Sequence, residues 1–116
     1  MNDYTEQLIL GIEGAAYFRH NKSVEYPDDE RNIISAEALD KLAEYVKEID
    51  DNHPVLQAFA LWSEADPDNS ISCIEHVSNE LSRFCFNGEE ENEPFLQRLA
   101  SKIREELGIP AVRSAS

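Results

Sequence analysis

The feature that most constrains the fold is a helical spacing of apolar residues, which recurs along most of the chain. It is clearest over residues 35–49, where five apolar side chains recur at positions that share one face of a helix: Leu39, Leu42, Ala43, Val46 and Ile49. Such spacing gathers the apolar side chains on one face of an α-helix. Almost no segment alternates with the period of two that a half-buried strand needs, so we expect no sheet.

The same pattern, read with capping and stop signals, predicts five helices. They run over about 4–19, from Ser35 as N-cap to Ile49, from Pro54 through Trp62, from Ile71 to a stop at Asn87-Gly88, and from near Pro94 to a stop at Gly108. The predicted fold class is therefore all-α, a compact bundle of five to six short helices. We expect one domain over 1–116, with a longer polar loop at 21–34 and a loose tail at 111–116.

The charge of the chain limits its partners. The 116 residues include 24 acidic and 10 basic side chains, for a formal net charge of -14. Such a field repels nucleic acid and anionic lipid headgroups, and it attracts cations and basic protein surfaces. No apolar run approaches the ~20 residues that span a bilayer. We therefore expect neither a nucleic-acid nor a membrane partner.

Two further features favour the cytoplasm. The N-terminal stretch places acids before its short apolar run and lacks the basic start of a signal peptide. Cys73 and Cys85 fall on one predicted helix, about 18 Å apart at the helical rise per residue. That separation is far beyond disulfide reach, so we expect reduced thiols.

The acidic residues crowd into the predicted loops, in the runs PDDE, IDDN, EADPD and EEENE. On the helix after Ser35 they also form a stripe, made of Glu37, Asp40, Glu44 and Glu48, which is most simply a solvated face. Carboxylates that converge within a loop repel one another by ~1 kcal/mol per pair at about 4 Å in water. A bound divalent cation reverses that cost, so the loops are the candidate metal sites.

The segment SEADPDNSISCIE, residues 63–75, is the best of these candidates. Asp66, Asp68 and Ser70 occupy the first three side-chain positions of an EF-hand loop. The match then fails, because Ile71 stands where the turn needs glycine and Val77 where a bidentate glutamate is required. A calcium site here is therefore not an EF-hand, and we expect Asp66 and Asp68 to be joined by Glu64 or Glu75.

A second interpretation of the same segment is a helix start. Asp66 and Pro67 suit an N-cap and first helical position, and Ser72 with Glu75 forms a capping box one turn later. The two interpretations do not exclude each other. The second-best metal cluster is Asp28, Asp29 and Glu30, whereas the glutamates of 89–93 are more typical of a solvated linker.

No pattern in the chain predicts an enzyme. His20, His53 and His76 are isolated, and Cys73 with His76 supplies two soft ligands where structural zinc needs four. There is no glycine-rich phosphate loop, nucleophile elbow or metallohydrolase helix motif.

With short helices, no EF-hand, and acidic loops such as PDDE and EADPDNS, the chain resembles the cyanobacterial calcium-binding protein, a small acidic helical calcium buffer. The resemblance extends over the whole length in character but carries no ligand over residue by residue. It implies a cytoplasmic domain that binds about two calcium ions and lowers free calcium.

Two functions follow from the sequence. The first is calcium binding, as a buffer or weak sensor, at the carboxylate-rich loops. The second is an acidic inhibitor, immunity protein or nucleic-acid mimic that binds a basic protein partner through the Glu37–Glu48 stripe.

Overall fold

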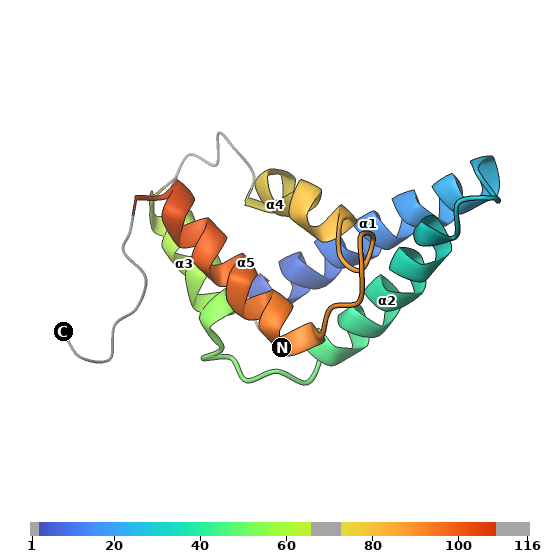
Figure 1. The fold of residues 1–116 in the computed structure, drawn as a ribbon. Coiled ribbons are helices and arrows are strands. Elements are labelled where there is room, and N and C mark those ends of the chain that lie inside the picture. Colours follow the sequence, from blue (N-terminus) through green and yellow to red (C-terminus); the bar gives the residue numbers. More distant parts are fainter. Residues whose placement is uncertain (1–2, 66–72, 109–116) are drawn as a thin grey trace.

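A computed structural model of the protein describes residues 3–65 and 73–108, with the side chains of all of these except 73–76 (Figure 1). The described part contains five helices and no strand: α1 (Asp3–Glu25), α2 (Glu30–Val46), α3 (Pro54–Ala65), α4 (Cys73–Ser82) and α5 (Asn92–Glu106). The all-α prediction is confirmed. None of the helices described is long and apolar enough to cross a membrane.

α1 and α2 form a hairpin whose closed end projects beyond the other helices, on the right of Figure 1. The polar loop predicted at 21–34 is much shorter than expected, because α1 continues to Glu25 and α2 begins at Glu30. Pro27 accounts for the break, since it has no N–H to donate and biases the preceding Tyr26 away from the helical conformation.

The start of α2 also differs from the prediction. Its N-cap is Asp29, whose carboxylate accepts a hydrogen bond from the backbone N–H of Arg31. Ser35, the predicted N-cap, lies fully buried within the helix, and its hydroxyl donates to the backbone carbonyl of Phe84 at 2.6 Å. Both residue types cap helices well, so tertiary packing decided between them.

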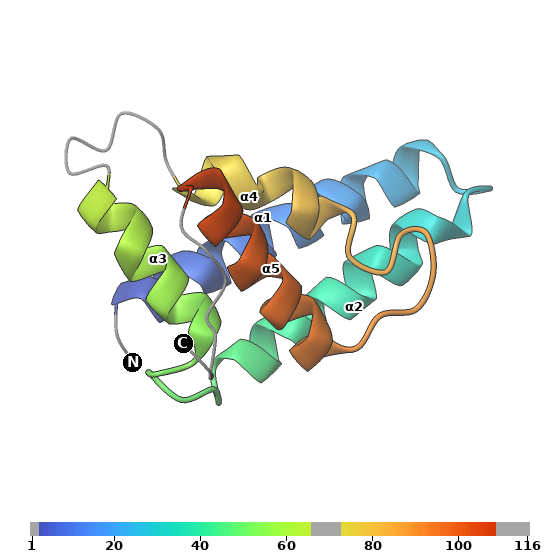
Figure 2. The ribbon, with the colours of Figure 1, turned by 60° about the vertical axis from the view of Figure 1, so that its left-hand side comes forward.

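The other helix ends agree with the sequence in part. Pro54 opens α3 as predicted. α5 ends at Glu106, two residues before the predicted stop at Gly108, which has φ 72° and donates its N–H to the Glu105 carbonyl. α4 ends at Ser82, earlier than the stop predicted at Asn87-Gly88. The chain then turns and runs alongside α2 before entering α5, and we call this stretch the 83–91 segment (Figure 2).

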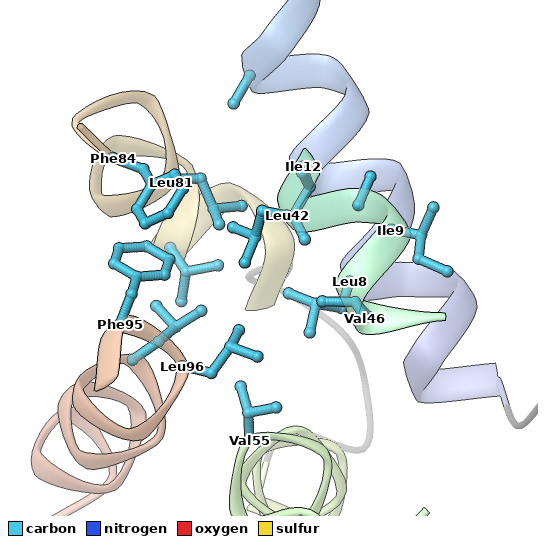
Figure 3. Close-up of a cluster of buried hydrophobic side chains, with 14 of the residues drawn as sticks. Leu8, Ile9, Ile12, Leu42, Val46, Val55, Leu81, Phe84, Phe95 and Leu96 are labelled. Atoms are coloured by element: carbon cyan, nitrogen blue, oxygen red, sulfur yellow. The ribbon is translucent and has the colours of Figure 1, made fainter. Parts of the chain in front are cut away.

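The core lies where all five helices meet. α4 packs on α1, and α3 packs on α5 (Figures 1 and 2). Figure 3 shows side chains from every helix pointing into one cluster, which includes the fully buried Leu8, Ile12, Leu42, Val55, Leu81 and Leu96. Each fully buried leucine stabilises the fold by about 1.5–3 kcal/mol relative to exposure.

Arg19 of α1 fixes the start of the 83–91 segment. Its guanidinium donates to the Ser82 carbonyl at 2.7 Å and to the Asn32 side-chain oxygen at 3.1 Å, and it lies 3.9 Å from the centroid of the Phe86 ring. Arg31 covers the same ring at 4.5 Å. Burial, followed by the nearby Arg31 charge, lowers the pKa of Arg19. The two cations therefore clamp Phe86 against the α1/α2 hairpin.

Candidate functional site

The structure describes only part of the predicted calcium site at 63–75. Asp66 and Asp68 lie outside the described residues, and so does the side chain of Glu75. Glu64 is exposed in the last turn of α3. Among the described residues, no group of three or more His, Cys, Asp and Glu side chains is arranged to hold a metal ion. The calcium site at this segment stays a prediction.

The second predicted cluster lies in the connection between α1 and α2. Asp29 is held by Arg31, which donates to its two carboxylate oxygens at 2.8 and 2.7 Å. This pair lowers the pKa of Asp29 and raises that of Arg31. Asp28 and Glu30 are both exposed beside it. Asp29 therefore serves as a helix cap and ion-pair partner, which leaves Asp28 and Glu30 as the available carboxylates.

Several basic side chains are held by neighbouring carboxylates. The pairs with short contacts are Lys22–Glu25, Arg31–Asp29, Lys47–Glu44, Arg98–Glu90 and Lys102–Glu80. Because the chain has 24 acidic and only 10 basic residues, a large excess of carboxylates remains after such pairing. The outer surface is therefore dominated by negative charge.

The acidic stripe predicted on the second helix does face solvent. Glu37, Asp40 and Glu44 are all exposed on α2, and Glu48 is exposed in the turn that follows its end at Val46. Asp40 contacts His20 at 3.0 Å. Glu37, at the start of the stripe, has no ion-pair partner among the described residues.

A cleft of about 640 Å³ opens between the first half of α2 and the 83–91 segment, and we call it the α2 cleft. Its apolar lining comes from Ile34, Ala38 and Cys85, and Ile34 is 51% exposed. Its charged lining comprises one cation and four carboxylates: Lys41, Glu37, Glu89, Glu90 and Glu91. The α2 cleft therefore has an apolar and an acidic lining, and we call the apolar residues its floor and the carboxylates its rim.

Glu90 holds the 83–91 segment in place along this cleft. Its carboxylate accepts a hydrogen bond from the backbone N–H of Cys85 at 3.1 Å and pairs with Arg98 of α5. Glu37, Glu89 and Glu91 are exposed, and no ion pair within the described part of the chain involves them. These three carboxylates are thus the available charges of the rim.

Cys85 contributes a neutral thiol to the floor of the cleft. Its side chain is buried, and its Sγ–H donates to the Glu90 carbonyl at 3.5 Å. Burial is the main cause that raises the pKa of this thiol, and the nearby Glu90 and Glu89 charges add to it. A thiol with a raised pKa is a poor nucleophile, so Cys85 acts as apolar lining.

The electrostatics of the rim favour a cation. Two carboxylates about 4 Å apart repel by ~1 kcal/mol in water and by several-fold more where the effective dielectric constant falls toward 20. A guanidinium or ammonium group placed among the rim carboxylates would be attracted by each of them. Lys41 supplies only one such charge from the protein itself.

The sequence alone did not reveal this cleft. The glutamates of 89–93 were expected to form a solvated linker, and Cys85 to lie within a helix. The cleft exists because the 83–91 segment folds back along α2, which is about fifty residues earlier in the chain. No local sequence pattern predicts that the 83–91 segment packs along α2.

A second polar cluster, at the junction of α2, α3 and α5, fastens the fold. The Glu93 carboxylate accepts hydrogen bonds from the Tyr45 hydroxyl at 2.6 Å, from His53 Nε2 at 2.9 Å and from Gln97 at 2.6 Å. His53 Nδ1 meanwhile accepts the backbone N–H of Val55 at 3.1 Å. Through its two ring nitrogens, His53 therefore links the start of α3 to the start of α5.

These features define the chain as an acidic, all-helical protein with a cleft lined by four carboxylates and one lysine. Comparisons with protein-family models, with curated proteins and with solved structures found no match of any of the three kinds.

Proposed function

We propose that this protein binds a basic surface of another protein, with the α2 cleft as the point of contact. The observation that carries the proposal is the pairing of an aliphatic floor, around Ile34, with three available rim carboxylates, Glu37, Glu89 and Glu91. Arginine and lysine side chains have the matching form, since an apolar stem carries a cationic head.

The charge of the whole molecule supports the same proposal. A net charge of -14 attracts a basic partner over distances comparable to the Debye length and so raises its association rate. The acidic stripe of α2 continues from the rim through Asp40 and Glu44. A partner with several cations therefore has further carboxylates to contact beside the cleft.

The direct test uses a fluorescent peptide of about six arginines, with anisotropy recorded at about 0.15 M salt in the presence of a chelator. We expect saturable binding that weakens as salt rises, and no binding of an uncharged peptide of equal length. Absence of saturable binding under these conditions would sink the proposal, because a true site keeps short-range contacts that salt screens only in part.

A second candidate function is calcium binding, as a buffer or weak sensor. The sequence Asp66-Pro67-Asp68-Asn69-Ser70 favours it, since Asp66, Asp68 and Ser70 place oxygen-bearing side chains at every second position. We propose Glu64 and Glu75 as the further carboxylates of this coordination shell, and Asp28 and Glu30 as the available carboxylates of a separate second cluster between α1 and α2. Calorimetric titration with calcium in physiological salt and excess magnesium tests this function, and heats that vanish under those conditions would exclude it.

A further inference from the structure

The dipeptide Asn87-Gly88 is the most reactive pair of neighbours in the 83–91 segment. Asparagine is chemically labile, because a backbone nitrogen can attack the carbon of its side-chain amide. That nitrogen belongs to the next residue, so a side chain on the next residue hinders the attack. Asn87 is the one asparagine of the sequence that glycine follows, and every other asparagine precedes a residue with a Cβ.

The structure leaves this dipeptide accessible. Because α4 ends at Ser82, Asn87 and Gly88 lie in the connection to α5, outside every helix of the described chain (Figure 2). Both residues are exposed. Within the described residues, no hydrogen bond involves the N–H of Gly88 or the side chain of Asn87. The two reacting groups are therefore not held apart by other contacts.

Asn52 provides a comparison within the same protein. It is also exposed and also lies in a turn, between α2 and α3. The residue after it is His53, which has a Cβ and donates its N–H to the Asp50 carbonyl at 2.9 Å. Both differences disfavour attack on Asn52, so this residue is the internal standard for Asn87.

We infer that Asn87 is a site of self-modification, where conversion to isoaspartate loosens the 83–91 segment. The backbone nitrogen of Gly88 gives up its proton and bonds to Cγ of Asn87, and the side-chain nitrogen leaves with that proton as ammonia. Water then opens the resulting succinimide ring at either carbonyl. One opening gives aspartate, and the other gives isoaspartate, whose backbone runs through Cβ and Cγ. Water and the protein's own atoms are the only reactants.

The modification falls within a small closed loop. Glu90 closes this loop, since its carboxylate accepts the N–H of Cys85 at 3.1 Å and its carbonyl accepts the Cys85 thiol at 3.5 Å. Isoaspartate lengthens the backbone between these two residues by one methylene, whereas aspartate leaves the backbone unchanged. Isoaspartate therefore changes the span that the contacts between Cys85 and Glu90 have to close.

Either product also adds a carboxylate beside charged groups. Asn87 lines a hollow of about 350 Å³ together with Arg83, Arg98 and the rim residue Glu89. Arg98 pairs with Glu90, whereas Arg83 makes no ion pair within the described part of the chain. A carboxylate at position 87 would therefore find Arg83 available, and this attraction opposes repulsion by Glu89. The reaction itself does not depend on the proposed function.

Incubation in mildly alkaline buffer at physiological temperature, followed by peptide mapping with mass spectrometry, tests the inference. We expect Asn87 to convert at least about tenfold faster than Asn52, with isoaspartate separated from aspartate by chromatographic retention. Equal rates at the two asparagines would overturn the inference, and so would a product without isoaspartate.

Two variants test the chemistry of the attack. Gly88→Ala should slow the conversion at least about fivefold, because a Cβ crowds the nitrogen. That Cβ meets no atom within 4 Å, but Gly88 has φ 153°, so circular dichroism must confirm the fold. Asn87→Gln keeps the glycine and should abolish the conversion, since its longer side chain would have to close a larger ring. Conversion at an unchanged rate in either variant would contradict the mechanism.

Hydrogen exchange tests the effect on the loop. We expect the amide of Cys85 to exchange at least about fivefold faster in the isoaspartate form than in the unmodified protein. Asn87→Asp is the matched control, because it adds the same charge without the extra methylene and should leave this exchange rate unchanged. Equal exchange of the Cys85 amide in the isoaspartate form and in Asn87→Asp would overturn the inferred loosening.

Discussion

The hydroxyl of Tyr45 in α2 donates a hydrogen bond of 2.6 Å to the carboxylate of Glu93 in α5. His53, at the entrance to α3, donates to the same carboxylate. One acidic side chain therefore joins the ends of three helices. In the chain, Glu93 comes two residues after Glu91, the last carboxylate of the α2 cleft. The junction at Glu93 therefore also fixes where α5 begins relative to α2.

Removing the Tyr45 hydroxyl should destabilise the protein. We expect Tyr45→Phe to lower the free energy of unfolding by about 1–2 kcal/mol, because a hydrogen bond to a charged acceptor is lost. Urea denaturation measures the change. Tyr17→Phe is the control, since Tyr17 is 70% exposed and its loss of a hydroxyl should cost almost nothing. Equal effects of the two substitutions would show that the Tyr45 bond contributes no stability.

The same junction should make stability depend on pH. Hydrogen bonds from Tyr45, then from Gln97 and His53, lower the pKa of Glu93. A depressed folded-state pKa adds stability above the unfolded value of about 4.3, and this contribution disappears as pH falls through the folded pKa.

The stability difference between wild type and Glu93→Gln should therefore shrink as pH is lowered from about 6 to about 3. Denaturation midpoints recorded at each pH check this. Glu91→Gln is the control, because this exposed carboxylate makes no capping hydrogen bond at the start of α5. A difference that is the same at every pH would contradict the assignment.

Ser35 should be important for holding the 83–91 segment. Its buried hydroxyl donates to the Phe84 carbonyl. We expect Ser35→Ala to cost about 1–3 kcal/mol, since a buried carbonyl loses its donor. Ser63→Ala, at an exposed position of α3, should change the unfolding free energy by only a few tenths. A loss below about 0.5 kcal/mol for Ser35→Ala would show that the carbonyl is satisfied in another way.

Cys85 should be under backbone strain. Its φ is 58°, a left-handed conformation that favours glycine over residues with a Cβ. Both Cys85→Gly and Cys85→Ala remove the thiol, but only the glycine variant relieves the strain. We expect the glycine variant to be more stable than the alanine variant by about 1 kcal/mol in thermal or urea unfolding. The reverse order would contradict the strained conformation.

The sequence predicted the helices through their apolar faces, because Leu39, Leu42 and Val46 reach the core at the spacing that defines a helix. It predicted the start of a helix wrongly where two residues were equally suited to be its N-cap. Asp29 and Ser35 are both good N-caps, and only the contact between Ser35 and Phe84, 49 residues later in the chain, made Ser35 part of the helix interior.

The candidate site was less predictable for the same reason. The stripe containing Glu37 was visible from helical spacing, but its partner in the α2 cleft, Glu91, lies in a different segment. The turn at Cys85 that brings the two together depends on Arg19 and Arg31 holding Phe86, and no pattern within the 83–91 segment encodes those contacts.

The most direct test of the account compares two triple variants in the arginine-peptide binding measurement. The cleft variant is Glu37→Gln, Glu89→Gln and Glu91→Gln, and the control variant removes the same charge elsewhere through Glu6→Gln, Asp51→Asn and Glu105→Gln, all exposed. We expect the cleft variant to bind at least about tenfold more weakly than the control. Equal affinities for the two variants would show that net charge alone attracts the peptide and would contradict a site in the α2 cleft.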